Sequence, residues 1–131
     1  MKKLIIVISM SILFCSINTI SAKENFFEVA KNKFEKKRFD ESKFLFQRNI
    51  VFNPKDSASY LYLAKIYNHE NNEKKELKYL ETTLLLEPDN EDALYMLIDI
   101  RLKKSNFSEV KKLFNNFKLI CTSMCDKIET I

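Results

Sequence analysis

A 34-residue internal repeat runs through most of this chain. Its two prolines, Pro54 and Pro88, lie 34 residues apart, and rows begun at Lys23, Ser57 and Glu91 align large apolar residues in shared columns. These columns are Phe26, Tyr60 and Leu94; Val29, Leu63 and Leu97; Leu45, Tyr79 and Leu113; Phe46, Leu80 and Phe114; Phe52, Leu86 and Ile120. A repeat of this length indicates that copies of one supersecondary unit are stacked on each other.

Each row contains two segments whose apolar residues have helical spacing. In the second row Tyr60, Leu63 and Tyr67 lie three or four residues apart, and the same spacing returns after a polar turn. Proline cannot continue a helix, so Pro54 and Pro88 are expected just beyond the second helix of their rows. Asp56-Ser57 and Asp89-Asn90 follow them as candidate N-caps for the next helix. Each row is therefore predicted to be a pair of helices.

The composition argues against β-hairpins and against the common classes of enzyme. The chain has no glycine, which disfavours tight hairpin turns and excludes the glycine-rich loops that bind phosphate. A single histidine, His69, cannot supply the His sets of most catalytic zinc sites, and no Ser or Cys has an evident His and acid to complete a relay. We therefore expect no enzymatic activity, no cofactor, no metal and no small-molecule substrate.

Together, these features resemble the tetratricopeptide repeat over about residues 23–122. The second row matches best, through an aromatic, a Leu and a small residue in its first helix and a proline at its end: Tyr60, Leu63, Ala64, Tyr67, Leu80, Leu84 and Pro88. The resemblance implies an all-α superhelical solenoid of about three repeats, at 23–56, 57–90 and 91–122, with a short tail at 123–131. The second helices carry polar residues where the family has small ones: Ser42, Asn49, Glu76 and Thr83. In the middle row, Glu76 and Thr83 predict looser contacts between helices.

The resemblance also implies where a partner binds. In this family the first helix of each repeat lines a concave groove, and the corresponding positions here are Phe27, Lys31, Phe34, Leu61, Lys65, His69, Tyr95 and Asp99. We expect a peptide or helix segment of another protein in this groove, as in a scaffold or assembly factor. The alternative left open is that Phe27, Phe34 and Tyr95 pack against a neighbouring helix or the tail, because apolar residues at helical spacing are more often core.

The first 22 residues have the layout of a secretory signal peptide. Lys2 and Lys3 precede an apolar run from Leu4 to Ile20, and the small residues Ser21-Ala22 follow. Cleavage after Ala22 would give a secreted or periplasmic bacterial protein. The alternative is an uncleaved segment that anchors the chain in the inner membrane as a subunit of an envelope complex, and only then is the membrane a partner. Without residues 1–22 the chain has 20 basic and 18 acidic residues, so the charge gives no indication of nucleic-acid binding.

Cys121 and Cys125 are the two cysteines outside the apolar N-terminal segment. In an exported protein, a pair four residues apart is a disulfide candidate that would shape the C-terminal tail. The alternative is a periplasmic thiol-disulfide protein that uses this pair for redox chemistry. That alternative lacks the CxxC spacing at a helix start that is typical of such enzymes.

Overall fold

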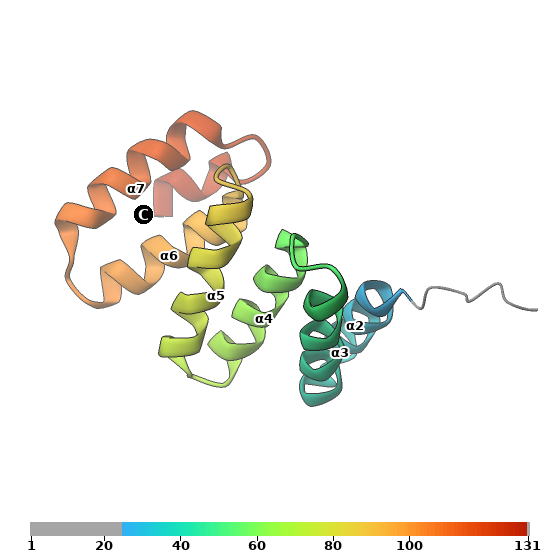
Figure 1. Cartoon of the computed structure of the whole chain (residues 1–131). Coiled ribbons are helices and arrows are strands. Elements are labelled where there is room, and N and C mark those ends of the chain that lie inside the picture. The colour runs from blue at the N-terminus through green and yellow to red at the C-terminus, as the bar shows by residue number, and fades with distance from the viewer. Residues whose placement is uncertain (1–24, 131) are drawn as a thin grey trace, which may run out of the picture.

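The chain is an all-α solenoid. The computed structural model describes residues 25–130, in which no strand occurs. Its elements are α2 (Phe26–Glu35), α3 (Phe39–Phe52), α4 (Ser57–His69), α5 (Glu73–Leu86), α6 (Glu91–Lys103), α7 (Phe107–Ile120) and the 3₁₀ helix η1 (Cys125–Thr130). Consecutive helices pack as three pairs, α2 with α3, α4 with α5 and α6 with α7, which follow one another in a curved row (Figure 1). The predicted fold class is confirmed.

The turn inside each pair places one residue in the left-handed backbone region. Lys37, Asn71 and Ser105 have φ values of 58°, 56° and 55°, and they are separated by the 34-residue repeat. The following amide bonds back across the helix end in each case, as Arg38 N–H does to the Lys33 carbonyl. This is the Schellman arrangement, in which glycine is the usual left-handed residue. A chain without glycine therefore uses Lys, Asn and Ser at this point.

The links between pairs follow the prolines. Helices α3 and α5 end two residues before Pro54 and Pro88, as the restriction on the residue before proline requires. Asn90 is the N-cap of α6, and its side chain accepts a hydrogen bond from Ala93 N–H. Asp56 is the N-cap of α4, and its carboxylate accepts instead from the Ser59 hydroxyl. The expected N-cap segments are thus in place.

The core lies along the seam between successive pairs. Ala30, Ala64 and Ile98 occupy one repeat position and are fully buried in all three pairs. The apolar repeat columns of the sequence correspond less well to buried positions in the first pair, where Val29 is 42% exposed and Phe52 is 63% exposed. Within residues 25–130 no helix precedes α2, and none of the described elements covers the outer face of the first pair.

The polar residues of the second helices do not loosen the packing, contrary to the sequence-based prediction. Ser42, Asn49, Glu76 and Thr83 are each at most 9% exposed. Ser42 donates to the Ala30 carbonyl, and Asn49 donates to Asp56 and Ser59. Because each polar side chain finds a hydrogen-bond partner, the helices stay close at positions where the family has alanine.

The tail covers the apolar end of the last pair. Met124 and Ile128 pack against the cluster that contains Leu94, Ile98 and Phe117. The proposed signal peptide or anchor, residues 1–22, lies outside the described residues. Among the helices that the structure does describe, none is both long and apolar enough to cross a bilayer.

Candidate functional site

A pocket lies where the second and third pairs meet. It has a volume of about 290 Å³ and is lined by residues of α4, α5 and α6: Lys65, Asn68, Glu76, Tyr95, Met96 and Asp99. Lys65, Tyr95 and Asp99 are three of the groove residues predicted from the sequence. The structure thus brings together in one place residues that lie a full repeat apart.

The cations around this pocket are already paired. Lys65 Nζ lies 2.5 Å from a carboxylate oxygen of Asp92 on α6. Lys103 Nζ lies 2.6 Å from Asp99, one turn along the same helix. The Lys65 pair also links α4 to α6 beside the pocket.

Glu76 is the least exposed charged residue at the pocket. It is 4% exposed, at the start of α5, and its Oε1 accepts a hydrogen bond of 2.8 Å from the Asn68 amide. Burial raises the pKa of Glu76 above its usual value, while the Asn68 hydrogen bond and the charge of Lys103 act in the opposite direction. The pocket therefore contains a carboxyl group that is held in place by a neutral side chain.

The predicted groove residues of α2 lie in an aromatic cluster with α3 and α4. Phe27 contacts Phe46 and Tyr62, with ring centroids 5.7 and 5.9 Å apart. Phe34 contacts Tyr62 at 5.1 Å. Both phenylalanines are half-buried, so the first and second pairs pack through these rings, as the alternative interpretation held. Lys31 is half-buried on the same helix.

Two residues of α4 differ from their predicted place. Leu61 is 8% exposed and belongs to the core cluster with Ala64 and Leu80, so its assignment to an open groove is wrong. Its side chain is enclosed because α6 packs directly over that position. His69 is exposed at the end of α4, with its ring 4.2 Å from that of Phe39, and it does not line the pocket.

Sequence reasoning missed Asn68, Glu76 and Met96 as site residues. Asn68 and Met96 adjoin predicted residues on helical faces, but neither has a chemical signature of its own. Glu76 did have a signal, because a carboxylate at a position where the family has a small residue must be buried. That signal was interpreted only as a packing defect.

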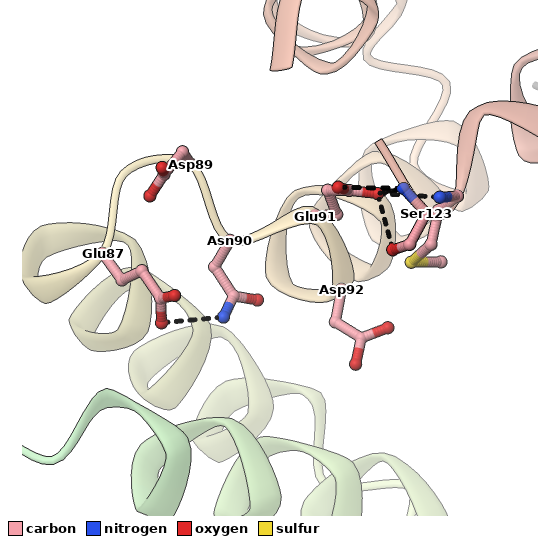
Figure 2. Close-up of a pocket in the computed structure, with 7 residues that line it drawn as sticks. Glu87, Asp89, Asn90, Glu91, Asp92 and Ser123 are labelled. Carbon is pink, nitrogen blue, oxygen red and sulfur yellow. Dashed lines mark hydrogen bonds between the residues drawn. The ribbon is translucent and has the colours of Figure 1, made fainter. Parts of the chain in front are cut away.

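A second pocket, of about 350 Å³, lies where α5 meets α6 and the tail (Figure 2). It is lined mostly by acidic and polar side chains: Glu87, Asp89, Asn90, Glu91, Asp92, Ser123 and Met124. Most of these carboxylates already accept hydrogen bonds or form ion pairs within the protein. Glu87 accepts from Ser57 and Asn90, and Asp92 pairs with Lys65. Among the described residues, no cluster of His, Cys, Asp and Glu could hold a metal ion.

Glu91 fastens the tail to the start of α6. Its carboxylate accepts hydrogen bonds from the backbone N–H groups of Thr122, Ser123 and Met124 and from the Thr122 and Ser123 hydroxyls. The Thr122 hydroxyl, followed by these amides, lowers the pKa of Glu91 to about 2. The charged carboxylate is thus what holds this segment.

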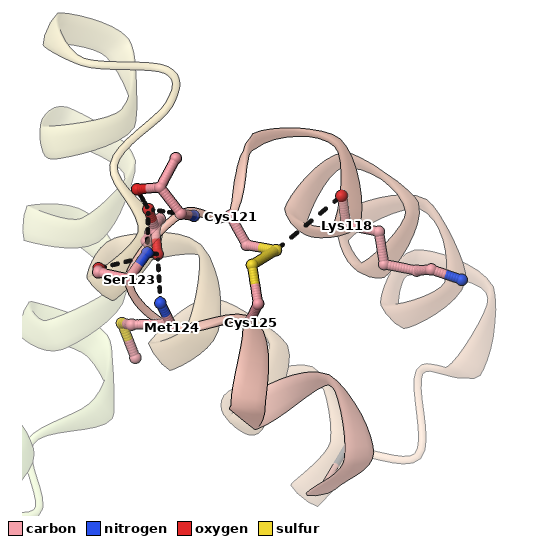
Figure 3. Close-up of a disulfide and its surroundings, with 7 residues drawn as sticks. Lys118, Cys121, Ser123, Met124 and Cys125 are labelled. Carbon is pink, nitrogen blue, oxygen red and sulfur yellow. Dashed lines mark hydrogen bonds between the residues drawn. A yellow bond between two sulfur atoms is a disulfide. The ribbon is translucent and has the colours of Figure 1, made fainter.

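Cys121 and Cys125 lie on either side of that segment (Figure 3). Their Cα atoms are 5.3 Å apart and their sulfur atoms face each other, which is within the range that a disulfide bridges. Cys121 is the C-cap of α7. The negative end of a helix dipole disfavours a thiolate, whereas reactive cysteines favour helix N-termini.

Solved structures with the same fold include complexes with protein or peptide partners. A chain of the CopN–Scc3 complex matches with a TM-score of 0.68 and 15% identity, over 85% of this chain and 68% of that chain. The Yersinia enterocolitica type III secretion chaperone SycD, in complex with a peptide of the translocator YopD, matches with a TM-score of 0.70 and 15% identity, over 86% of this chain and 88% of that chain. No protein-family model and no curated protein sequence matches the chain. The likeness therefore concerns the fold, a solenoid of the tetratricopeptide type.

Proposed function

We propose that this protein is a non-enzymatic interaction module, a scaffold or assembly factor, which binds a peptide or helix segment of another protein in its concave groove, at the pocket between α4, α5 and α6. The observation that carries the proposal is the pocket at which Lys65, Tyr95 and Asp99 meet. A solenoid presents such a concave surface along its whole length, and a pocket between repeats can fix the register of an extended partner.

The neighbouring structures support this proposal. One of them is SycD in complex with a peptide of YopD, and the other is a complex of CopN with Scc3. A fold of this class can serve many functions, so the specific argument rests on the pocket itself. Its lining combines apolar groups, from Tyr95 and Met96, with charged groups, which suits a peptide side chain.

We propose further that the module acts in the bacterial envelope. The support is the sequence layout of residues 1–22, with cleavage after Ala22 giving a secreted or periplasmic chain. Mass analysis of the protein recovered from cells tests this location. A chain that starts at Lys23 is the expected result, and retention of the whole segment in a membrane fraction would support the anchored alternative instead.

An array of random 12-residue peptides, probed with the purified protein, tests the binding function. We expect a subset of peptides to bind, and Asn68→Trp to weaken that binding at least about tenfold by filling the pocket. Asn115→Trp is the matched control, because Asn115 is an exposed residue of α7 far from the pocket lining. Binding to no peptide, or equal weakening by both variants, would contradict the proposal.

For the cysteine pair we propose a structural disulfide. The position of Cys121 at the end of α7 and the tail's contact with the last pair favour a staple over a redox centre. Replacing both cysteines by serine should lower the free energy of unfolding by about 2 kcal/mol on the loop-entropy model and leave peptide binding unchanged. Oxidase or reductase activity in the wild-type protein that the double variant lacks would favour the thiol-disulfide alternative.

A further inference from the structure

We propose that the partner segment places the cationic side chain of a lysine or arginine in the pocket, against Glu76, with its alkyl stem along Tyr95 and Met96. This inference rests on the proposed function and specifies the chemistry of the partner. It starts from the location of Glu76, which lines the pocket although it is only 4% exposed.

Among the residues that the structure describes, Glu76 has one hydrogen-bond partner, and that partner is neutral. The Asn68 amide donates to Oε1, and among the described residues no lysine or arginine forms an ion pair with either carboxylate oxygen. A buried carboxylate is costly unless it is paired with a cation or fully hydrogen-bonded. In the free protein the Glu76 carboxylate therefore lacks a cationic partner within residues 25–130, and a ligand can supply one.

Three lysines around the pocket and the start of α5 already have carboxylate partners of their own. Lys65 bonds Asp92, Lys103 bonds Asp99 and Lys104 bonds Glu73. Lys103 does favour the charged form of Glu76 through space, but its ammonium group lies against Asp99 and its side chain is 65% exposed. An ion pair between Glu76 and one of these lysines would require the lysine to leave its present carboxylate, whereas a cation on the partner would leave the three pairs intact.

The rest of the lining suits a long basic side chain. Lysine and arginine bury their aliphatic stems against apolar groups while the charged end reaches a polar partner, and an aromatic face attracts a cation. Tyr95 and Met96 supply such a wall beside Glu76 and Asp99. At about 290 Å³ the pocket is at the small end of the range for ligand sites, which favours one side chain over a whole small molecule.

The experiment uses peptides selected by the purified protein from a random 12-residue library. We expect the selected peptides to share a lysine or arginine flanked by apolar residues. In one selected peptide the essential arginine is replaced by citrulline, which has nearly the same shape without the charge. We expect the citrulline peptide to bind the wild-type protein about ten- to a hundredfold more weakly.

The protein variant completes a double-mutant cycle. Glu76→Gln keeps the size of the side chain. This variant should bind the arginine and citrulline peptides with equal affinity, because a neutral glutamine cannot form the ion pair with arginine. Glu81→Gln is the matched control: Glu81 is exposed on the same helix, and its loss should preserve the full preference for arginine.

Each outcome separates this inference from the proposed function. Selection of peptides without a basic residue, or equal binding of the citrulline and arginine peptides to the wild-type protein, would overturn the inference and leave peptide binding standing. Equal loss of the arginine preference in Glu76→Gln and Glu81→Gln would also overturn it, since general electrostatics would then explain the preference. Failure to select any peptide would overturn the proposed function itself. The citrulline comparison needs only the wild-type fold, so equal binding of the two peptides overturns the inference even if Glu76→Gln is unstable.

Discussion

The two junctions between repeats use the same positions with different side chains. At the first junction, between the α2–α3 pair and α4, the rings of Phe34 and Tyr62 meet with centroids 5.1 Å apart. At the second junction, between the α4–α5 pair and α6, the positions 34 residues further on hold Asn68 and Met96, which line the pocket. Ser42 at the first junction likewise corresponds to Glu76 at the second.

This difference shows how one repeated backbone can make a closed interface and an open site. Two aromatic rings fill the space between helices, and Ser42 is satisfied within its own pair by the Ala30 carbonyl. An amide and a thioether fill less of that space, and Glu76 bonds only the Asn68 side chain at the pocket. The site thus arises from a few substitutions on a common frame.

The largest effect is expected from removing the ring at the centre of the first junction. Phe46 is fully buried and stacks on Tyr62 with centroids 4.9 Å apart. Phe46→Ala should therefore lower the free energy of unfolding by about 3–5 kcal/mol, measured by urea denaturation. Phe114, the equivalent residue of the last pair, is only half-buried, so Phe114→Ala is the control and should cost less. Equal costs would show that the first junction is not specially dependent on its aromatic core.

A transplant should convert the second junction into a copy of the first. The triple variant Asn68→Phe, Glu76→Ser and Met96→Tyr fills the pocket and removes the buried carboxylate. We expect peptide affinity to fall at least about tenfold while the helical circular-dichroism signal is retained. The opposite change, Phe34→Asn with Tyr62→Met, should leave binding at the second junction unchanged. Unaltered binding in the triple variant would show that the pocket is not the binding site.

A smaller, stabilising effect is expected at the turns, which are alike in all three pairs. Lys37 and Ser105 have positive φ, and a side chain in that region costs about 1 kcal/mol relative to glycine. Lys37→Gly and Ser105→Gly should each raise the free energy of unfolding by up to about 1 kcal/mol, measured by thermal or urea denaturation. Asn71→Gly should raise the free energy of unfolding by less, because asparagine tolerates the left-handed region better than lysine or serine. A loss of stability at these positions would show that the left-handed turns do not form.

The smallest effect concerns the tail, which covers the apolar end of the last pair. The pKa of Glu91 is about 2 in the folded state, against an ordinary 4.5. The contribution of its hydrogen bonds to the stability of the attached tail is therefore present above about pH 4.5. That contribution should be lost as the pH falls from about 4.5 towards 2, because protonation removes the negative charge and turns one acceptor oxygen into a donor. Hydrogen exchange at Thr122 to Met124 is the measurement.

Glu91→Gln is the control for this acid release. Its tail amides should exchange faster than those of the wild type at neutral pH, and the two proteins should converge as the pH approaches 2. Protection that stays equal in both proteins at neutral pH would mean that the carboxylate does not hold the tail.

Local patterns determined much of the fold from the sequence. The 34-residue spacing of apolar residues and prolines predicted helix pairs and their links, because helical periodicity and the effect of proline depend on residues close together in the chain. The sequence also indicated the N-cap segments of α4 and α6. It did not show that Lys37, Asn71 and Ser105 adopt positive φ, since none of them is the usual residue there.

Only the tertiary structure decided which groove positions form a site. Lys65, Tyr95 and Asp99 were predicted together with Phe27, Phe34 and Leu61, yet only the first three line the pocket. Phe27 and Phe34 pack against Tyr62, and Leu61 lies in the core. The hydrogen bond from Asn68 to Glu76 and the space beside Met96 depend on the volumes of side chains from α4, α5 and α6 together. Periodicity assigns a residue to one face of a helix, but whether that face is filled or open depends on the side chains that the neighbouring helices bring to it.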